Sequence, residues 1–268
     1  MEYLLILAIF IAAFFASLFG LGGGVLYTPF QLWLGIPLKE AAATSLLLVL
    51  VTSLSATTVY RHSHRVDWSL AIMLEIPTTA GAYLGGLISN WFSSVLLSVV
   101  LAVLLVIAAL LMIHPPHRPI ISCGRSPGKK STFWIWTRQW EGNRYWLDLR
   151  CVFAVMFTAG LLISMVGISG GVLKIPLMVL LMKVPMSVAV GSSAFMVGLT
   201  AFAGLLGHAT VGHVQWRMAF LLAVPVLVGA QVGSRVSLRL NLQHLKRYYG
   251  WFLIGVAIIT LLYSLKPG

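Results

Sequence analysis

Charged side chains are scarce in this chain, and acidic ones are nearly absent. Asp and Glu together number 6 among 268 residues, and all charged residues make up only 9%. A soluble domain carries about 25% charged residues, so this composition excludes an ordinary soluble globular protein. Apolar stretches of roughly twenty residues, enough to cross a bilayer as a helix, recur along the whole length. We therefore predict an all-α polytopic membrane protein.

Metal-ligating and nucleic-acid-binding patterns are also lacking. The two cysteines, Cys123 and Cys151, fit neither a metal-ligand spacing nor a disulfide framework. His62 and His64 have no carboxylate or cysteine nearby to complete a metal site, so we expect no metal and no cofactor. The net charge of +12 comes mostly from loops, where basic residues orient a protein in the bilayer. It indicates the lipid bilayer, and not nucleic acid, as the partner.

What the chain does contain is a glycine-rich break that occurs twice. The first copy is GLGGGVLYTP at residues 20–29, and the second is GISGGVLKIP at 167–176. Each interrupts a long apolar run. Within a membrane, such a break is tolerated only where it is buried in protein or lines a cavity. Paired, interrupted segments in corresponding halves are typical of a transporter's binding site.

The sequence predicts that the chain consists of two copies of one unit. The repeats are residues 1–113 and 151–268, joined by a polar segment at 114–150. In the first repeat, the broken segment 3–34 is followed by three spans at about 41–60, 69–89 and 94–113. In the second, the broken segment 151–182 is followed by spans at about 188–207, 217–237 and 248–265. At a shift of 148 residues, Thr44-Ser45 falls on Ser192-Ser193, Pro77 on Pro225, and Gly81 and Gly85 on Gly229 and Gly233. For these last four glycines we favour close helix packing over ligand contact.

The course of the broken segment decides the orientation of the repeats. If it crosses the bilayer, Lys and Arg divide into 11 on one side and 6 on the other. If it enters and returns as a hairpin, they divide into 14 and 3. The positive-inside rule favours the sharper asymmetry. We therefore expect re-entrant segments, inverted repeats, and a cytoplasmic 114–150 segment.

The two breaks predict an anion site. A glycine break leaves backbone N–H groups free at the start of the next half-helix, and such ends attract anions. Hydroxyls at the start of the following span can bond an oxyanion or merely cap the helix. The alternative is that the glycines only allow helices to cross closely. The candidate substrate-binding residues are Gly22, Gly23, Gly24, Tyr27, Thr44, Ser45, Ser169, Gly170, Gly171, Lys174, Ser192 and Ser193.

Two ionisable residues lie deep within apolar segments. Lys174 follows the second break, where the first copy has Tyr27, and Glu75 lies inside a span. Such residues are costly in a membrane and indicate function. Lys174 is a candidate anion ligand, and Glu75 is a candidate proton carrier. The structural alternative is that the two pair with each other.

The duplicated motifs resemble those of the TauE/SafE family of sulfite exporters, also called the toluene-sulfonate uptake permease family. The resemblance rests on Gly-x-Gly-Gly-Gly-x-x-x-x-Pro at 20–29, on Gly-x-Ser-Gly-Gly-x-x-x-x-Pro at 167–176, and on the two Thr/Ser-Ser pairs. It implies a multi-pass inner (plasma) membrane permease that moves small sulfur-containing anions, such as sulfite or sulfoacetate-like organosulfonates, commonly out of the cell. Alternating access around the paired breaks is the expected mechanism. Self-association into a homo-oligomer stays open.

Three competing functions stay open. Gly167-Ile168-Ser169-Gly170 matches the Gly-x-Ser-Gly signature of rhomboid intramembrane proteases, with His208 or His213 as partner to Ser169. Against this, the first copy has Gly22 at the position of Ser169, so we expect no enzyme. A permease for carboxylates or other anions is the second alternative, and a channel-like or scaffold protein without coupled transport is the third.

Overall fold

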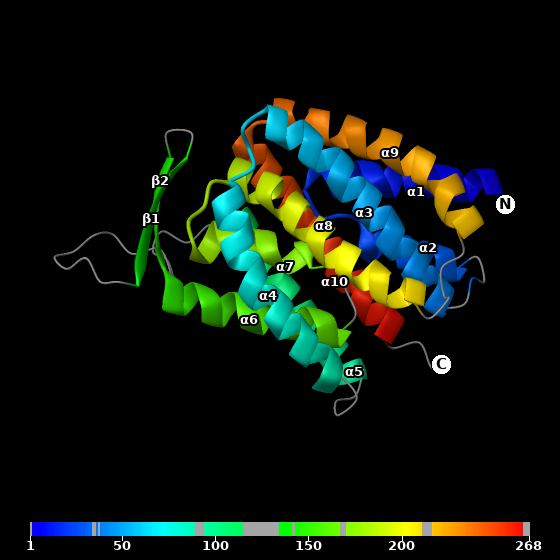
Figure 1. The fold of residues 1–268 in the computed structure, drawn as a ribbon, viewed down its shortest axis with the longest axis horizontal. Helices are drawn as coiled ribbons and strands as arrows, with labels where there is room; N and C mark the ends of the chain where they lie inside the picture. The colour runs from blue at the N-terminus through cyan, green and yellow to red at the C-terminus, as the bar shows by residue number, and fades with distance from the viewer. Residues whose placement is uncertain are drawn as a thin grey trace. The chain divides into compact units, whose positions relative to one another are not determined.

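The computed structural model describes residues 2–264 apart from 34–35, 37, 89–93, 115–133, 141–142, 167–169 and 211–215. Its helices are α1 (Glu2–Leu18), α2 (Gly24–Trp33), α3 (Leu38–His62), α4 (Trp68–Ile88), α5 (Ser94–Ile113), α6 (Leu149–Val166), α7 (Gly171–Pro176), α8 (Met186–Thr210), α9 (Trp216–Arg239) and α10 (Leu242–Ser264). A π-helical turn, η2 (Leu177–Leu181), continues α7, and two strands, β1 (Ile135–Trp140) and β2 (Asn143–Asp148), precede α6 (Figure 1).

The helices lie where the sequence predicts spans and broken segments. Each predicted span corresponds to one helix, and each broken segment is split at the glycines, between α1 and α2 and between α6 and α7. Three of the described helical segments, Ala43–His62, Met186–Ala203 and Trp216–Arg239, are long and apolar enough to cross a membrane. The structure is therefore mostly helical, with several apolar candidates for membrane spans.

The helices form two compact units, and each unit contains parts of both repeats. The first unit is 1–66 with 190–240, and the second is 67–189 with 241–268. In the first unit α1 packs against α9, and in the second α6 packs against α4. In the repeat predicted from the sequence, α6 is the counterpart of α1 and α4 that of α9. On that prediction the two pairs are equivalent, and each joins one helix of each half.

Small residues allow the two helices of each pair to approach each other closely. A side chain at Gly233 would collide with the backbone carbonyl of Phe14 on α1, and one at Gly229 with that of Phe10. In the second unit a side chain at Gly81 would collide with the carbonyl of Phe157 on α6. The predicted packing role of these three glycines is confirmed, whereas the surroundings of Gly85 lie outside the described side chains.

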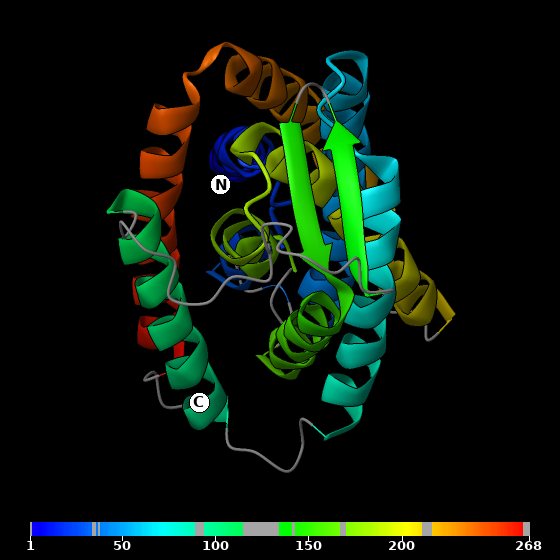
Figure 2. The ribbon, with the colours of Figure 1, turned by 90° about the vertical axis from the view of Figure 1, so that its left-hand side faces the viewer.

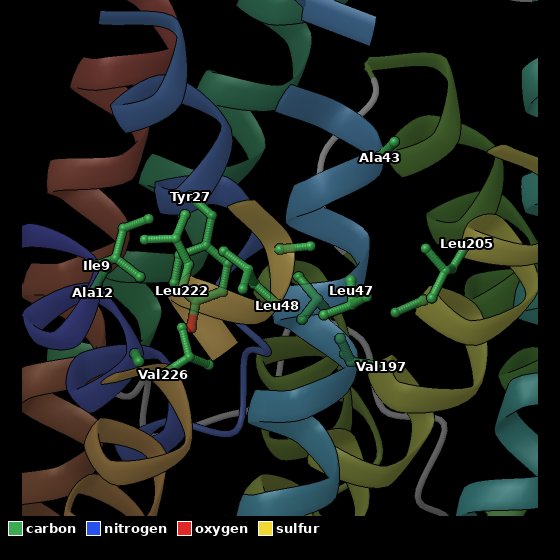
Figure 3. Packing of buried hydrophobic residues seen from close by; sticks show 14 residues of the cluster. Ile9, Ala12, Tyr27, Ala43, Leu47, Leu48, Val197, Leu205, Leu222 and Val226 are labelled. Carbon is green, nitrogen blue, oxygen red and sulfur yellow. The ribbon is translucent and has the colours of Figure 1, made fainter. Parts of the chain in front are cut away.

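The core of the first unit is an apolar cluster drawn from five helices. It gathers around Tyr27 of α2 and Leu48 of α3, both fully buried, and includes Ile9, Val197 and Leu222 (Figure 3). In the second unit α5 lies beside α10 (Figure 2), and a side chain at Gly250 would meet Ile113 of α5. Each unit is thus held by ordinary side-chain packing between helices.

The polar 114–150 segment ends in a β-hairpin, which differs from the all-α prediction. Strands β1 and β2 pair antiparallel, with Trp136 opposite Leu147 and Arg138 opposite Tyr145 (Figure 2). Arg138 donates two hydrogen bonds, of 2.9 and 3.0 Å, to the fully buried carboxylate of Asp67 just before α4. The hairpin is therefore anchored to the second unit by a bidentate ion pair.

Cys151, in the first turn of α6, is disulfide-bonded. Two isolated cysteines did not predict this bond, and the absence of a disulfide expected from the sequence is wrong for Cys151.

Candidate functional site

The first glycine break reverses the direction of the chain. Gly20, Gly22 and Gly23 have φ angles of 69°, 77° and 90°, a left-handed backbone that glycine adopts without steric cost. Before the break, the Tyr60 hydroxyl near the end of α3 donates to the Ser17 carbonyl at 2.6 Å. α1 therefore ends beside the C-terminal end of α3.

After the break, α2 runs back along α3. The Tyr27 hydroxyl lies 2.6 Å from Oγ1 of Thr52, and Nε2 of Gln31 donates to Oγ of Ser45 at 2.9 Å. Later residues of α2 thus contact earlier residues of α3, so these two helices are antiparallel. α1 has the opposite sense.

Contacts with α9 establish the sense of α1. Phe10 and Phe14 meet Gly229 and Gly233 in that order, so α1 and α9 run the same way. α3 also follows α9, since Ser55 bonds Leu227 and Arg65 bonds Leu238. The three helices run alongside one another in Figure 1. The first broken segment is therefore a helical hairpin within its unit.

Gly22 lies where α3 and α8 face each other. A side chain at this position would meet Val197 of α8 and Val49 of α3, and its Cβ would lie 3.2 Å from the Ser53 hydroxyl. Ser53 is only 1% exposed, and among the described residues its Oγ has no hydrogen-bond partner. The tip of the hairpin thus combines a close-packed apolar wall with one unsatisfied hydroxyl.

Tyr27 covers the other side of the tip. The Cβ of any side chain at Gly23 would lie 2.5 Å from the Tyr27 ring. The ring is fully buried, and its hydroxyl is held by Thr52, which in turn donates to the Leu48 carbonyl at 2.8 Å. Position 23 therefore requires glycine for its space as well as for its φ angle.

The hydroxyl of Ser45 belongs to a network between α2 and α3. Its Oγ accepts hydrogen bonds from Thr28 Oγ1 and from Gln31 Nε2, both at 2.9 Å. Thr44 beside it is 1% exposed. This network supports the structural role that was the alternative for Ser45, because two neighbours on α2 already bond the hydroxyl.

Ser192 and Ser193, the repeat counterparts of Thr44 and Ser45, are both fully buried on α8. By their contacts they belong to the first unit, which also holds the first break. The hydroxyl of Ser193 has no hydrogen-bond partner among the described residues. It therefore differs from the hydroxyl of Ser45, which accepts hydrogen bonds from Thr28 and Gln31 of α2.

The second break holds a buried ion pair. Nζ of Lys174 lies 2.7 Å from Oε2 of Glu75 on α4, and the two side chains are 0% and 7% exposed. The aliphatic part of Lys174 packs against Gly170, and the Tyr249 hydroxyl of α10 donates to the Val172 carbonyl of α7 at 2.9 Å. Pairing of Lys174 with Glu75, the structural alternative from the sequence, is thus present.

The structure divides the candidate residues between the two units. The first unit contains Gly22, Gly23, Gly24, Tyr27, Thr44, Ser45, Ser192 and Ser193, and the second contains Gly170, Gly171, Lys174 and Glu75. Ser169 lies outside the described residues.

Sequence similarity to known proteins identifies the family of this chain. The family described as sulfite exporter TauE/SafE matches residues 5–260, nearly the whole chain. The chain belongs to the TauE/SafE family. It is 30% identical over 240 residues to the probable membrane transporter protein YunE of Bacillus subtilis, with 86% of each chain covered. A probable membrane transporter protein of Methanocaldococcus jannaschii is 27% identical over 261 residues, covering 91% of this chain and 89% of its own. No solved structure matches the chain significantly.

Membership of the TauE/SafE family decides between the classes of function. The chain is a multi-pass membrane transporter and not an enzyme. The rhomboid-like protease based on Ser169 is therefore set aside. A transporter in the bilayer implies a small substrate.

Sequence reasoning missed three polar residues at the first break of this TauE/SafE protein. Gln31 bonds Ser45, Thr52 bonds Tyr27, and Ser53 faces Gly22. A signal was present for two of them, because Thr52 and Ser53 follow Ser45 by seven and eight residues, which places all three on one face of a helix. Buried hydroxyls repeated on one face of an apolar helix could have identified the face that meets α2.

Proposed function

We propose that this protein is a permease for small sulfur-containing anions, such as sulfite and sulfoacetate-like organosulfonates, and that it exports them. The observation that carries this proposal is the match to the sulfite exporter family over residues 5–260. The geometry of the first break supports an anionic substrate. Backbone amides of Gly22 and Gly23 and the buried hydroxyl of Ser53 lie together inside the first unit, where polar groups are costly without a partner.

We also propose that the repeats are inverted in the inner (plasma) membrane and that transport proceeds by alternating access. The reversal between α1 and α2 supports this arrangement. A segment that enters and returns, followed by three crossing spans, gives each half an odd number of crossings, so the second half begins from the opposite side. Inverted repeats around a shared site are a common basis for alternating access.

Two observations bear on the side of the membrane that holds the 114–150 segment, and they disagree. The distribution of Lys and Arg predicts the cytoplasm. The disulfide at Cys151 is instead typical of an oxidising compartment. We propose the cytoplasmic orientation, because it follows from charges along the whole chain. Labelling of a cysteine introduced near Lys129 by a membrane-impermeant reagent in intact cells would contradict it.

For the second break we propose a role in coupling. Because Glu75 neutralises the Lys174 ammonium at 2.7 Å, an anion gains the full attraction of Lys174 only by displacing Glu75. An anion that displaces Glu75 would leave a buried carboxylate that favours taking up a proton. Glu75→Gln should therefore abolish the pH dependence of transport. An unchanged pH profile would remove Glu75 from coupling.

The function is tested by flux into and out of proteoliposomes. Purified protein is reconstituted, and uptake of ³⁵S-sulfite, sulfoacetate, sulfolactate and acetate is measured against protein-free vesicles. We expect sulfite and the sulfonates to be carried and acetate to be excluded. Transport of acetate without sulfite or sulfonates would support the carboxylate permease instead, and no flux of any anion would contradict the proposal.

A further inference from the structure

The tip of the first hairpin carries backbone donors with no acceptor. The N–H groups of Leu26 and Tyr27 donate to the Gly23 carbonyl at 2.9 and 3.0 Å. Among the described residues, no backbone hydrogen bond is found for the three N–H groups of 22–24 that precede them. Free N–H groups at a helix start are a general feature, but these lie in the buried interior of a unit, where Gly22 and Gly23 are both covered.

The Ser53 hydroxyl is a separate donor at the same place. It projects from α3 to within 3.2 Å of the Cβ position of Gly22, is buried, and has no partner among the described residues. Serine within a helix commonly donates to the carbonyl four residues earlier, as Ser234 does to Ala230 at 2.6 Å. Ser53 does not, so its hydroxyl remains available to a ligand beside Gly22.

The described part of the second break, from Gly170 on, is arranged differently. The ammonium of Lys174 is taken up by Glu75, and α7 has only 6 residues before the π-helical turn. α2, in contrast, is a regular helix of 10 residues whose positive end faces the tip.

We infer that the transported anion binds at the first break, where the backbone N–H groups of 22–24 and the hydroxyl of Ser53 donate to its oxygens. This inference rests on the proposed anion transport and identifies its primary contacts. The site carries no formal charge of its own. Its ligand class is a compact oxyanion head group, such as sulfite or a sulfonate, because Val49 and Val197 close on Gly22 and would have to move farther apart for a larger group.

An uncharged site suits a transporter. Backbone amides and a hydroxyl stabilise an oxyanion through directed hydrogen bonds, but they do not hold it as a buried ammonium ion would. Binding can then be strong enough for selection and weak enough for release. Val49 and Val197 must move apart to admit the anion, so opening of the tip between α3 and α8 is part of binding.

The inference is tested by equilibrium binding of ³⁵S-sulfite to the full-length protein in nanodiscs. Ser53→Ala should raise Kd about tenfold or more, since it removes a hydrogen bond to a charged ligand. Ser53→Thr keeps the hydroxyl and should retain most of the affinity. The matched control is Ser234→Ala, which removes an equally buried hydroxyl already satisfied within α9; its Kd should stay within about twofold of wild type.

Thermal stability separates a ligand role from a structural one. Because Ser53 is unsatisfied, Ser53→Ala should leave the melting temperature unchanged or raise it, while binding is lost. Unchanged sulfite binding by Ser53→Ala would overturn the inference and leave the tip as a hydrated turn only. If wild type carries no anion in the flux assay, the proposed function itself fails. If wild type carries sulfite and Ser53→Ala carries it equally well, only the site assignment fails.

Discussion

Removal of one partner of the Lys174–Glu75 pair should destabilise the protein more than replacement of both. The two charged atoms are 2.7 Å apart in a buried setting. At an effective dielectric constant of about 20, their attraction is about 6 kcal/mol. Taking the two ions out of water costs several kcal/mol each, so the intact pair contributes little net stability.

The single variants have a different balance. Lys174→Met leaves the Glu75 carboxylate, 7% exposed, without its counter-charge. A lone buried partner costs about 3–5 kcal/mol. The double variant Lys174→Met/Glu75→Leu removes both charges and should lie near wild type. We therefore expect a coupling energy of about 3 kcal/mol or more between the two positions.

The measurement is a double-mutant cycle on purified protein, with unfolding in mixed detergent and SDS micelles. Lys183→Met is the matched control, because Lys183 is an exposed lysine close by in the same segment. It should change the free energy of unfolding by less than about 0.5 kcal/mol. A coupling energy below about 0.5 kcal/mol for the buried pair would show that the two charges do not depend on each other.

Three further outcomes follow from the packing. Gly23→Ala should abolish the monodisperse peak in fluorescence-detected size exclusion, because it combines a φ of 90° with a collision against the Tyr27 ring. Gly233→Leu should lower the melting temperature by forcing α1 away from α9, and an unchanged melting temperature would refute the packing role. Arg138→Ala removes the two hydrogen bonds that anchor the β-hairpin to Asp67 and should speed proteolysis of 134–148. Arg138→Lys should restore only part of the protection, because lysine cannot form the bidentate pair. Equal cleavage of Arg138→Ala and wild type would count against the anchor.

The sequence was most informative where composition changes sharply along the chain. Apolar length marked the spans, and glycine clusters marked the breaks, because an apolar environment tolerates few other ways to interrupt a helix. The packing role of Gly81 and Gly229 followed from their spacing with a second glycine four residues later. Pairing of Lys174 with Glu75 was one of the two predicted roles, because both are rare charged residues within apolar segments and their charges are opposite.

What the sequence did not predict depends on contacts between distant segments. The β-hairpin was not predicted because 114–150 is polar overall, although Ile135, Trp136, Thr137 and Trp140 are residue types that favour strands. Ser53 looked like one hydroxyl among many on α3, and only the fold places it against Gly22. The assembly of each unit from both halves is also absent from the repeat pattern, because an internal repeat shows which helices are equivalent and not which ones touch.

That exchange of helices between halves determines when the protein can assemble. α1 ends at Leu18, but its glycine-lined partner α9 begins only at Trp216. During synthesis α1 enters the bilayer long before the surface that it will cover exists. The face of α1 that meets Gly229 and Gly233 in the finished protein, at the carbonyls of Phe10 and Phe14, must be covered by lipid or by the insertion machinery until then. The first unit is therefore completed only when the chain is almost fully made. In a protein truncated before α9, α1 and the glycine break that follows it would lack the helix against which α1 packs.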